Sequence, residues 1–172
     1  MDVNLLKIKI SVNTLHKKFL RECYNYAKKS KHSSTHNGAV LIKNDKIILR
    51  GANVLPLGVK EIKSRFEGSN RHLYPNHAER DLLFKAAKKG LSTDKLTMAM
   101  PWLPCIACAN AIISSGVKKL IIHKQMIQRT SADWVKELKN AVEILKEAKV
   151  KIVAYDGLVG AEAYMHGEKW PA

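Results

Sequence analysis

The stretch KLTMAMPWLPCIACANAIISSGVKKLIIH, residues Lys95–His123, decides the fold class. Its first part, KLTMAM, is a short apolar run that predicts a β-strand. The segment CIACANAIISSG then predicts a helix that ends at Gly116, and KKLIIH predicts a second strand. Two strands that are joined by a helix are expected to run parallel in one sheet, so this stretch predicts an α/β fold.

Elements on both sides extend this unit. We expect a helix from Asn13 or Thr14 to about Lys31, followed by a β-hairpin, GAVLIKNDKIILRGAN. Residues 54–75 contain several prolines and glycines and predict a long loop with one short helix near residues 59–66. Further on we expect a helix over residues 76–90 with Asn76 as its N-cap, a helix from Ser131 to about residue 149, and a last strand, VKIVAYDG. This order implies a mixed sheet between layers of helices.

Length and composition favour one compact domain over residues 1–172, with a core at about 13–156 and a tail, 157–172, of unassigned structure. No run is apolar and long enough to cross a membrane, and the first residues do not resemble a signal peptide, so we expect a cytoplasmic location without membrane contact. Three cysteines argue against a disulfide scaffold.

The formal net charge of +15 favours anionic partners. Only six of the 30 basic residues are arginine, and the lysines are spread along the chain without a dense basic run. The charge is therefore compatible both with nucleic acid and with a small substrate that carries a phosphate.

Two short motifs open helices. His77-Ala78-Glu79 begins one predicted helix, and Cys105 and Cys108 share the first turn of another, so both sulfur atoms can reach one ion. The cysteine pair is compatible with half of a structural zinc site, with a redox pair, or, together with His77, with a three-ligand zinc site that leaves a position for water. An HExxH hydrolase is excluded because position 78 is Ala and position 81 is Asp.

The three-ligand interpretation accounts for all of these residues. His77, Cys105 and Cys108 would hold Zn²⁺, and Glu79, two residues after His77, would transfer protons. H-x-E followed by P-C-x-x-C is the signature of zinc nucleobase deaminases. Either motif alone is a weak signal, but the two in this order, each opening a helix, favour a deaminase.

The sequence resembles the cytidine and deoxycytidylate deaminase superfamily, and it is most similar to the bacterial and phage deoxycytidylate (dCMP) deaminases. The blocks that carry the resemblance are STHNGAVLI, GANVLPLG, NHAERDLLFKAAKKG and WLPCIACANAIISSGVKKLII. The resemblance implies a three-layer α/β/α sandwich with a five-stranded mixed sheet, one catalytic Zn²⁺ per chain and a homo-oligomer.

By resemblance, His77, Cys105 and Cys108 match the metal ligands and Glu79 matches the proton shuttle. Substrate contacts are expected from Asn53 on the sugar, the amide of Ala78 on the pyrimidine carbonyl, Trp102 as a stacking surface, and Arg71 on the phosphate. Asn53 is also compatible with a turn, and Trp102 with the core. Five other residues are plausible phosphate contacts or solvated loop residues: Ser33, Thr35, Asn37, Arg65 and His72. Asp81 departs from the family, which often has Asn at this position.

The resulting hypothesis is hydrolytic deamination of a free pyrimidine nucleotide, dCMP to dUMP and ammonia. Deamination of a base in nucleic acid, either adenosine in tRNA or cytosine in single-stranded DNA, is the alternative that the charge favours; a free nucleoside or base is another. PCIACANAI lacks the glycine that is usual after PCxxCA in tRNA deaminases, and no basic groove with interleaved aromatic residues is visible. A zinc-stabilised binding module without activity would be expected to lack Glu79.

Overall fold

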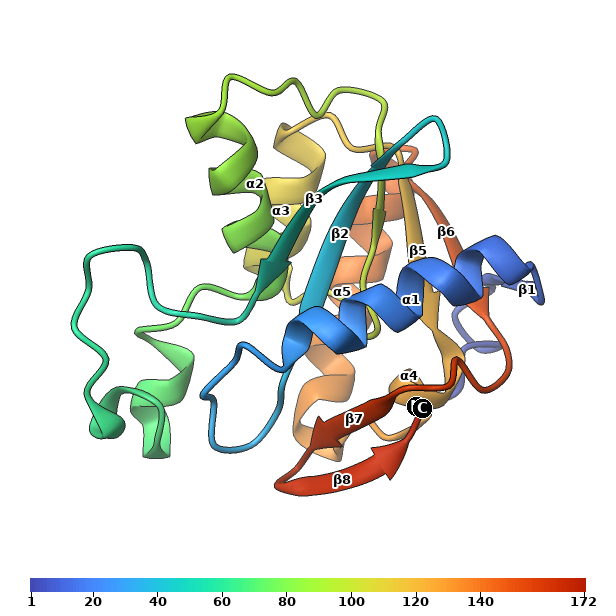
Figure 1. Cartoon of the computed structure of the whole chain (residues 1–172). Helices are drawn as coiled ribbons and strands as arrows, with labels where there is room; N and C mark the ends of the chain where they lie inside the picture. Colours follow the sequence, from blue (N-terminus) through green and yellow to red (C-terminus); the bar gives the residue numbers. More distant parts are fainter.

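The structure, a computed structural model that describes all residues from 1 to 172, is built on one six-stranded sheet (Figure 1). The strand order is β1-β6-β5-β4-β2-β3. The strands are β1 (Lys9–Ser11), β2 (Gly38–Lys43), β3 (Lys46–Ala52), β4 (Thr97–Ala99), β5 (Lys119–His123) and β6 (Lys151–Tyr155). β2 pairs antiparallel with β3 and β4, whereas β4, β5, β6 and β1 run parallel. The mixed sheet is confirmed, but it has six strands and not five.

β1 is the strand that the sequence did not predict. It has only three residues, and its pairing partner lies far along the chain: Lys9 pairs with Val153 and Ser11 with Tyr155. Three residues are too few to establish an alternating pattern, so this edge strand depends on a contact that only the folded chain provides.

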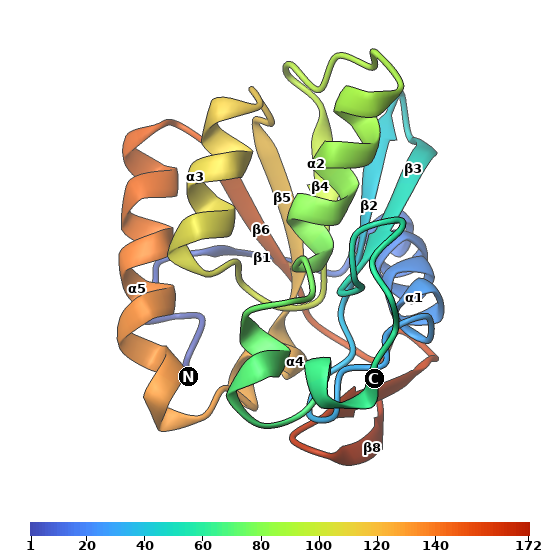
Figure 2. The same cartoon turned by 90° about the vertical axis from the view of Figure 1, so that its left-hand side faces the viewer.

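The helices lie on both faces of the sheet (Figure 2). α2 (Ala78–Lys88), α3 (Ile106–Ser114) and α5 (Ala132–Glu147) cover one face, and α1 (Thr14–Ala27) covers the other. Side chains alternate along a strand, so successive residues of β5 point to opposite faces of the sheet. Leu120 and Ile122 pack in the core under α2, α3 and α5, whereas Ile121 packs in the core under α1. The three-layer α/β/α sandwich is thereby confirmed.

Several expected helix ends are confirmed and one is wrong. Asn13 caps α1 by accepting the N–H of Leu15 at 2.8 Å. Gly90, with φ of +62°, follows the end of α2 as expected. Asn76, however, is not the N-cap of α2: that position is held by His77, whose side chain makes no capping bond. The imidazole nitrogen atoms of His77 are therefore not used to cap the helix and can bind another group.

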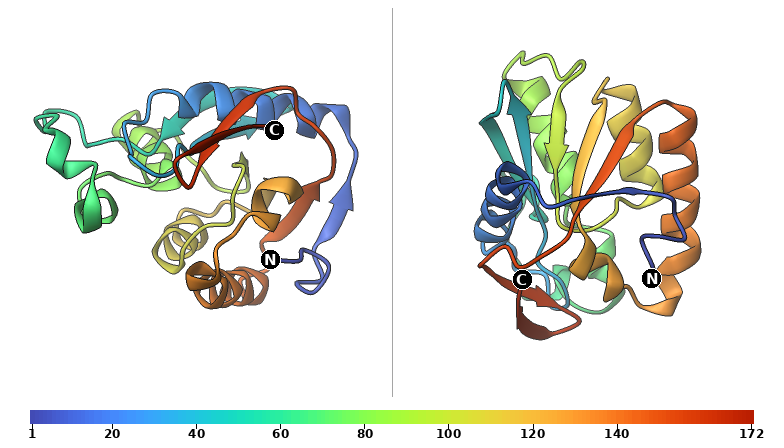
Figure 3. Two further views of the ribbon diagram at one scale, coloured as in Figure 1. Left: turned by 90° about the horizontal axis from the view of Figure 1, so that it is seen from below. Right: turned by 90° about the vertical axis from the view of Figure 1, so that its right-hand side faces the viewer.

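Two segments contain structure that was not expected. Residues 54–75 contain two 3₁₀ helices: η1 (Lys63–Arg65), which lies within the range 59–66 where a short helix was expected, and η2 (Gly68–His72), which was not expected. α4 (Lys124–Gln128) is an additional short helix. The tail forms a hairpin of β7 (Glu162–Met165) and β8 (Glu168–Pro171), which packs between α1 and α4 (Figure 3). None of the helices combines the length and the hydropathy needed to span a bilayer.

Candidate active site

The two helices that carry the predicted ligands, α2 and α3, lie side by side with their N-termini at the same end (Figure 2). His77 and Cys105 are the N-cap residues of these helices, both with extended backbone and no side-chain capping bond. His77 Nδ1 lies 3.4 Å from Cys105 Sγ and 3.5 Å from Cys108 Sγ. The fold therefore brings His77 together with two cysteines that lie 28 and 31 residues further along the chain.

These three side chains fit a zinc ion. In a tetrahedral site with Zn–N bonds of about 2.0 Å and Zn–S bonds of about 2.3 Å, neighbouring ligand atoms are about 3.5 Å apart. The two N···S distances agree with this separation, and the three ligand atoms all lie within 4.8 Å of one another. One nitrogen and two sulfur donors leave one tetrahedral position for a small molecule.

The surroundings favour thiolate at one sulfur. The hydrogen bond with Cys108 lowers the pKa of the Cys105 thiol to about 4, against the opposing effect of burial. Cys108 is fully buried at the start of α3, and its hydrogen bond with Cys105, together with burial, raises the pKa of its thiol. Glu79 is buried in the first turn of α2, and burial raises the pKa of its carboxyl group above the usual value.

α2 is held against β3 by two local features. A Cβ atom at Gly51 would lie 2.5 Å from the carbonyl oxygen of Ala78, so only glycine allows the strand to approach the helix this closely. The buried carboxylate of Asp81 accepts the N–H of Ala52 at 3.0 Å and the Nζ of Lys85 at 2.6 Å. Asp81, where the family often has Asn, therefore fixes the metal-site helix to the strand that leads into Asn53.

The Asp81→Leu variant should be less stable by about 1–3 kcal/mol, because the N–H of Ala52 would stay buried without an acceptor. Asp81→Asn keeps an acceptor for this N–H and should therefore lose less stability than Asp81→Leu. Lys85→Met removes only the partly exposed ion pair and should cost less than about 1 kcal/mol. Urea unfolding followed by circular dichroism measures all three. Equal stability of Asp81→Leu and the wild type would show that this bond does not fix the helix.

A cavity of about 300 Å³ opens above the ligands. Buried residues form its floor, including Ala78, Glu79 and Cys105, and exposed residues such as His72 and Asp133 border its mouth. Its walls come from several other parts of the chain. The residues that line them are His32, Ser34, Thr35, Asn37, Asn53, Arg71, Pro75, Trp102, Leu103, Ser131, Trp134, Leu138 and His166.

Aromatic rings follow one another along this cavity. The ring centroids of His32 and His72 are 5.7 Å apart, those of His72 and Trp134 are 6.1 Å apart, and those of Trp134 and Trp102 are 5.6 Å apart. The indole Nε1 of Trp102 donates to Thr130 Oγ1 at 2.8 Å, which fixes that ring. A flat heterocycle that entered the cavity could therefore stack on one of several aromatic rings.

Asn53 holds the wall formed by residues 30–37. Its Oδ1 accepts the N–H of Asn37 and its Nδ2 donates to the carbonyl oxygen of Thr35, both at 2.8 Å. His32 in the same segment accepts the N–H groups of Ser34 and Thr35 on Nδ1, each at 3.1 Å. Burial, with smaller contributions from His72 and Arg71, lowers the pKa of His32 to about 4, so its ring is neutral and carries its proton on Nε2.

All eight residues that the sequence indicated for the site lie at it. His77, Cys105, Ala78, Glu79, Asn53, Trp102 and Arg71 line the cavity, and Cys108 lies behind Cys105 against His77. Among the other phosphate candidates, Thr35, Asn37 and His72 line it, but Ser33 and Arg65 do not. Arg65 instead donates to the carbonyl oxygen of Lys60 and lies over the ring of Tyr74.

Sequence reasoning missed three groups of cavity residues: His32, the start of α5 with Ser131, Asp133 and Trp134, and His166. Trp134 also packs partly against the hydrophobic core. None of these residues belongs to a spacing motif. The only signal for His32 and His166 was a histidine near a predicted turn. Such histidines are too common to identify a cavity residue.

Comparison with known proteins agrees with this geometry. The family model for the cytidine and deoxycytidylate deaminase zinc-binding region matches residues 13–124. A probable deoxycytidylate deaminase of Caenorhabditis elegans is 32% identical over 110 residues, which are 61% of this chain and 55% of the worm protein. The deoxycytidylate deaminase of Enterobacteria phage T2 is 35% identical over 75 residues, 43% of this chain and 39% of the phage protein. The matched part is thus about half of each relative or less.

A solved structure shares the fold. The dCMP deaminase of cyanophage S-TIM5, determined with dCMP and dUMP, superposes with a TM-score of 0.66 at 21% identity, over 82% of this chain and 96% of the phage chain. The family match contains both helices that carry the His-Cys-Cys group and four of the six strands of the sheet. The chain therefore belongs to the cytidine and deoxycytidylate deaminase family, and residues 13–124 contain the zinc-binding region of that family.

Proposed function

We propose that the protein is a zinc-dependent hydrolase that deaminates a free pyrimidine nucleotide, dCMP, to dUMP and ammonia. The observation that carries this proposal is the convergence of His77, Cys105 and Cys108 beside buried Glu79 on the floor of one cavity. The names of the worm and phage relatives, and the dCMP and dUMP bound by the cyanophage enzyme, support a nucleotide substrate.

In this proposal His77, Cys105 and Cys108 hold one Zn²⁺ per chain. Zinc in such a site lowers the pKa of water and so makes a hydroxide nucleophile available near neutral pH. The carboxylate of Glu79 would take one proton from the attacking water and pass it to the cytosine ring nitrogen. It would then take the second proton, from the hydroxyl group added at C4, and pass it to the amino group, so that ammonia leaves as the C4 carbonyl forms. The Ala78 N–H, unpaired in the first turn of α2, donates to the pyrimidine carbonyl oxygen.

The remaining wall residues orient the nucleotide. Trp102 stacks on the base, and Asn53 lies beside the sugar while it holds residues 35–37 in place. Two buried polar atoms that lack a protein partner also belong to the cavity: the Nε of Arg71 and the Oδ1 of Asn37. A donor and an acceptor left unpaired in this way suit a ligand that offers a phosphate oxygen and a hydroxyl group.

A substrate panel tests the proposal. Purified zinc-loaded protein is offered dCMP, CMP, deoxycytidine, cytosine, tRNA and single-stranded DNA, and ammonia and deaminated products are measured. We expect dCMP to have the highest kcat/KM. Turnover of tRNA adenosine or DNA cytosine without turnover of dCMP would replace this proposal by the nucleic-acid function that the net charge of +15 favours.

The Arg71→Ala variant should lower kcat/KM for dCMP about 10- to 100-fold, since a hydrogen bond between charged groups contributes about 1.5–3 kcal/mol. The same variant should leave kcat/KM for deoxycytidine unchanged, because that substrate has no phosphate. Arg65→Ala is the matched control: it removes an arginine from the same segment, outside the cavity. Equal losses with dCMP and deoxycytidine would contradict a phosphate contact.

We further propose that residues 1–172 work as one deaminase domain, tail included. Free nucleotides as substrate and three unpaired cysteines agree with a cytoplasmic location. Exposed apolar side chains on residues 54–75, among them Leu57, Ile62 and Leu73, agree with a homo-oligomer.

A further inference from the structure

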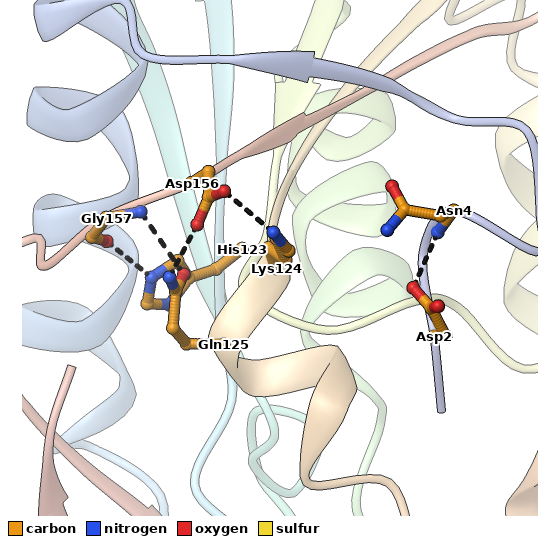
Figure 4. A network of polar contacts seen from close by, with 7 residues as sticks. All are labelled: Asp2, Asn4, His123, Lys124, Gln125, Asp156 and Gly157. Atoms are coloured by element: carbon orange, nitrogen blue, oxygen red, sulfur yellow. Dashed lines mark hydrogen bonds and ion pairs between the residues drawn. The ribbon is translucent and has the colours of Figure 1, made fainter.

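The β7–β8 hairpin lies outside the matched region, yet His166 in its turn lines the cavity. Polar contacts fix the point at which the chain leaves β6 for this hairpin (Figure 4). Asp156 accepts from Lys124 Nζ at 2.7 Å and from Gln125 Nε2 at 2.8 Å, and His123 Nε2 donates to the carbonyl oxygen of Gly157 at 2.9 Å. The hairpin therefore starts from a fixed base.

The hairpin is also bonded to the cavity wall formed by residues 30–37. The N–H of His36 donates to the Tyr164 carbonyl oxygen at 3.0 Å, and the N–H of Gly167 donates to the Ser34 carbonyl oxygen at 2.9 Å. The Tyr164 hydroxyl adds a bond to the Ser33 carbonyl oxygen at 3.1 Å. These bonds set the position of the hairpin turn relative to the cavity.

His166 is the residue that this turn presents to the cavity. Met165 pairs with Glu168, so His166 and Gly167 form a two-residue turn, with φ of +57° and +82°. Turns of this kind favour Asn-Gly, and histidine is among the residues that adopt positive φ more often than most. The ring Nε2 donates to the carbonyl oxygen of Arg129 at 2.9 Å, so Nδ1 of the neutral ring is a free acceptor.

We propose that His166 is a substrate-contacting residue whose Nδ1 accepts a hydrogen bond from the sugar 3′-hydroxyl at the cavity mouth, and that the β7–β8 hairpin holds it there. An acceptor suits a hydroxyl group and not a phosphate, which at neutral pH offers mainly acceptor oxygens. This inference rests on the proposed nucleotide substrate. It adds a specificity residue from a part of the chain that the family model does not cover.

The test compares two variants that both tolerate positive φ. His166→Gly removes the side chain, whereas His166→Asn keeps an acceptor near the position of Nδ1 but loses the bond to Arg129. Both are made in the inactive Glu79→Gln protein loaded with zinc, and dissociation constants are measured by the fluorescence of Trp102 and Trp134 at pH 8. Lys169→Gln is the control, since it removes only an exposed ion pair of the same hairpin.

We expect His166→Gly to weaken dCMP binding about 3- to 10-fold, the value of one neutral hydrogen bond. It should leave the binding of 2′,3′-dideoxycytidine monophosphate unchanged, because that nucleotide lacks the hydroxyl. His166→Asn should retain most of the affinity for dCMP, and Lys169→Gln should bind dCMP as tightly as the parent protein does.

Three results would overturn the inference. Equal weakening for both nucleotides would mean that His166 does not contact the 3′-hydroxyl, and equal losses in the Gly and Asn variants would mean that only the bond to Arg129 matters. Unchanged dCMP affinity in His166→Gly, with dCMP turnover by the wild type, would overturn the contact and leave the proposed function intact. If the wild type neither bound nor deaminated dCMP, both proposals would fail together.

Discussion

The Glu79→Gln variant should lose deaminase activity by on the order of 10²-fold or more while it retains one zinc ion per chain. Glutamine has the size of glutamate but cannot take up the proton that water releases, and position 79 is not among the residues of the His-Cys-Cys group. Because Glu79 is buried on the cavity floor, bulk water cannot easily replace it as a proton carrier.

The measurement combines initial rates on dCMP with zinc content by mass spectrometry. Glu143→Gln is the matched control, since it makes the same change of charge on the exposed side of α5. A Glu79→Gln protein that retained wild-type kcat would remove the proton-transfer role. A protein that lost its zinc as well would point to a structural role for the carboxylate.

The Cys108→Ser variant should lose both zinc and activity. Serine is a much poorer zinc ligand than thiolate, and Cys108 is fully buried with its sulfur 3.5 Å from His77 Nδ1. A metal that binds only the folded chain stabilises it, so the melting temperature should fall as well.

Cys23 provides the control for this experiment. It is equally buried, but its sulfur donates to the carbonyl oxygen of Ala99 and lies outside the His-Cys-Cys group. Cys23→Ser, whose hydroxyl can donate the same bond, should keep its zinc. Cys108→Ser protein with one zinc per chain and normal turnover would show that the metal site is elsewhere.

The sequence was a good guide where the signal is local. The run of apolar residues in KKLIIH, together with helix ends at Gly90 and Gly116, predicted parallel strands joined by helices. The spacing of Cys105 and Cys108 within one helical turn also predicted which side chains converge.

It was a poor guide where contacts join distant parts of the chain. β7 and β8 contain charged residues and are joined by a His-Gly turn, and Trp170 of β8 stacks on His123, which lies 47 residues earlier in the chain. The cavity walls from His32 and Trp134 likewise form only when the loop after α1 and the start of α5 both pack against His72. Local sequence patterns carry no information about such long-range contacts.

The chain order of the elements has a consequence for biosynthesis. The His-Cys-Cys group is complete once residue 108 has been made, but β1 at Lys9–Ser11 must wait for β6 at Lys151–Tyr155, and the cavity mouth must wait for His166. Pairings between such distant residues form late and slowly. A nascent chain can thus acquire its metal ligands well before it acquires its substrate pocket, and full activity is expected only after His166 has left the ribosome.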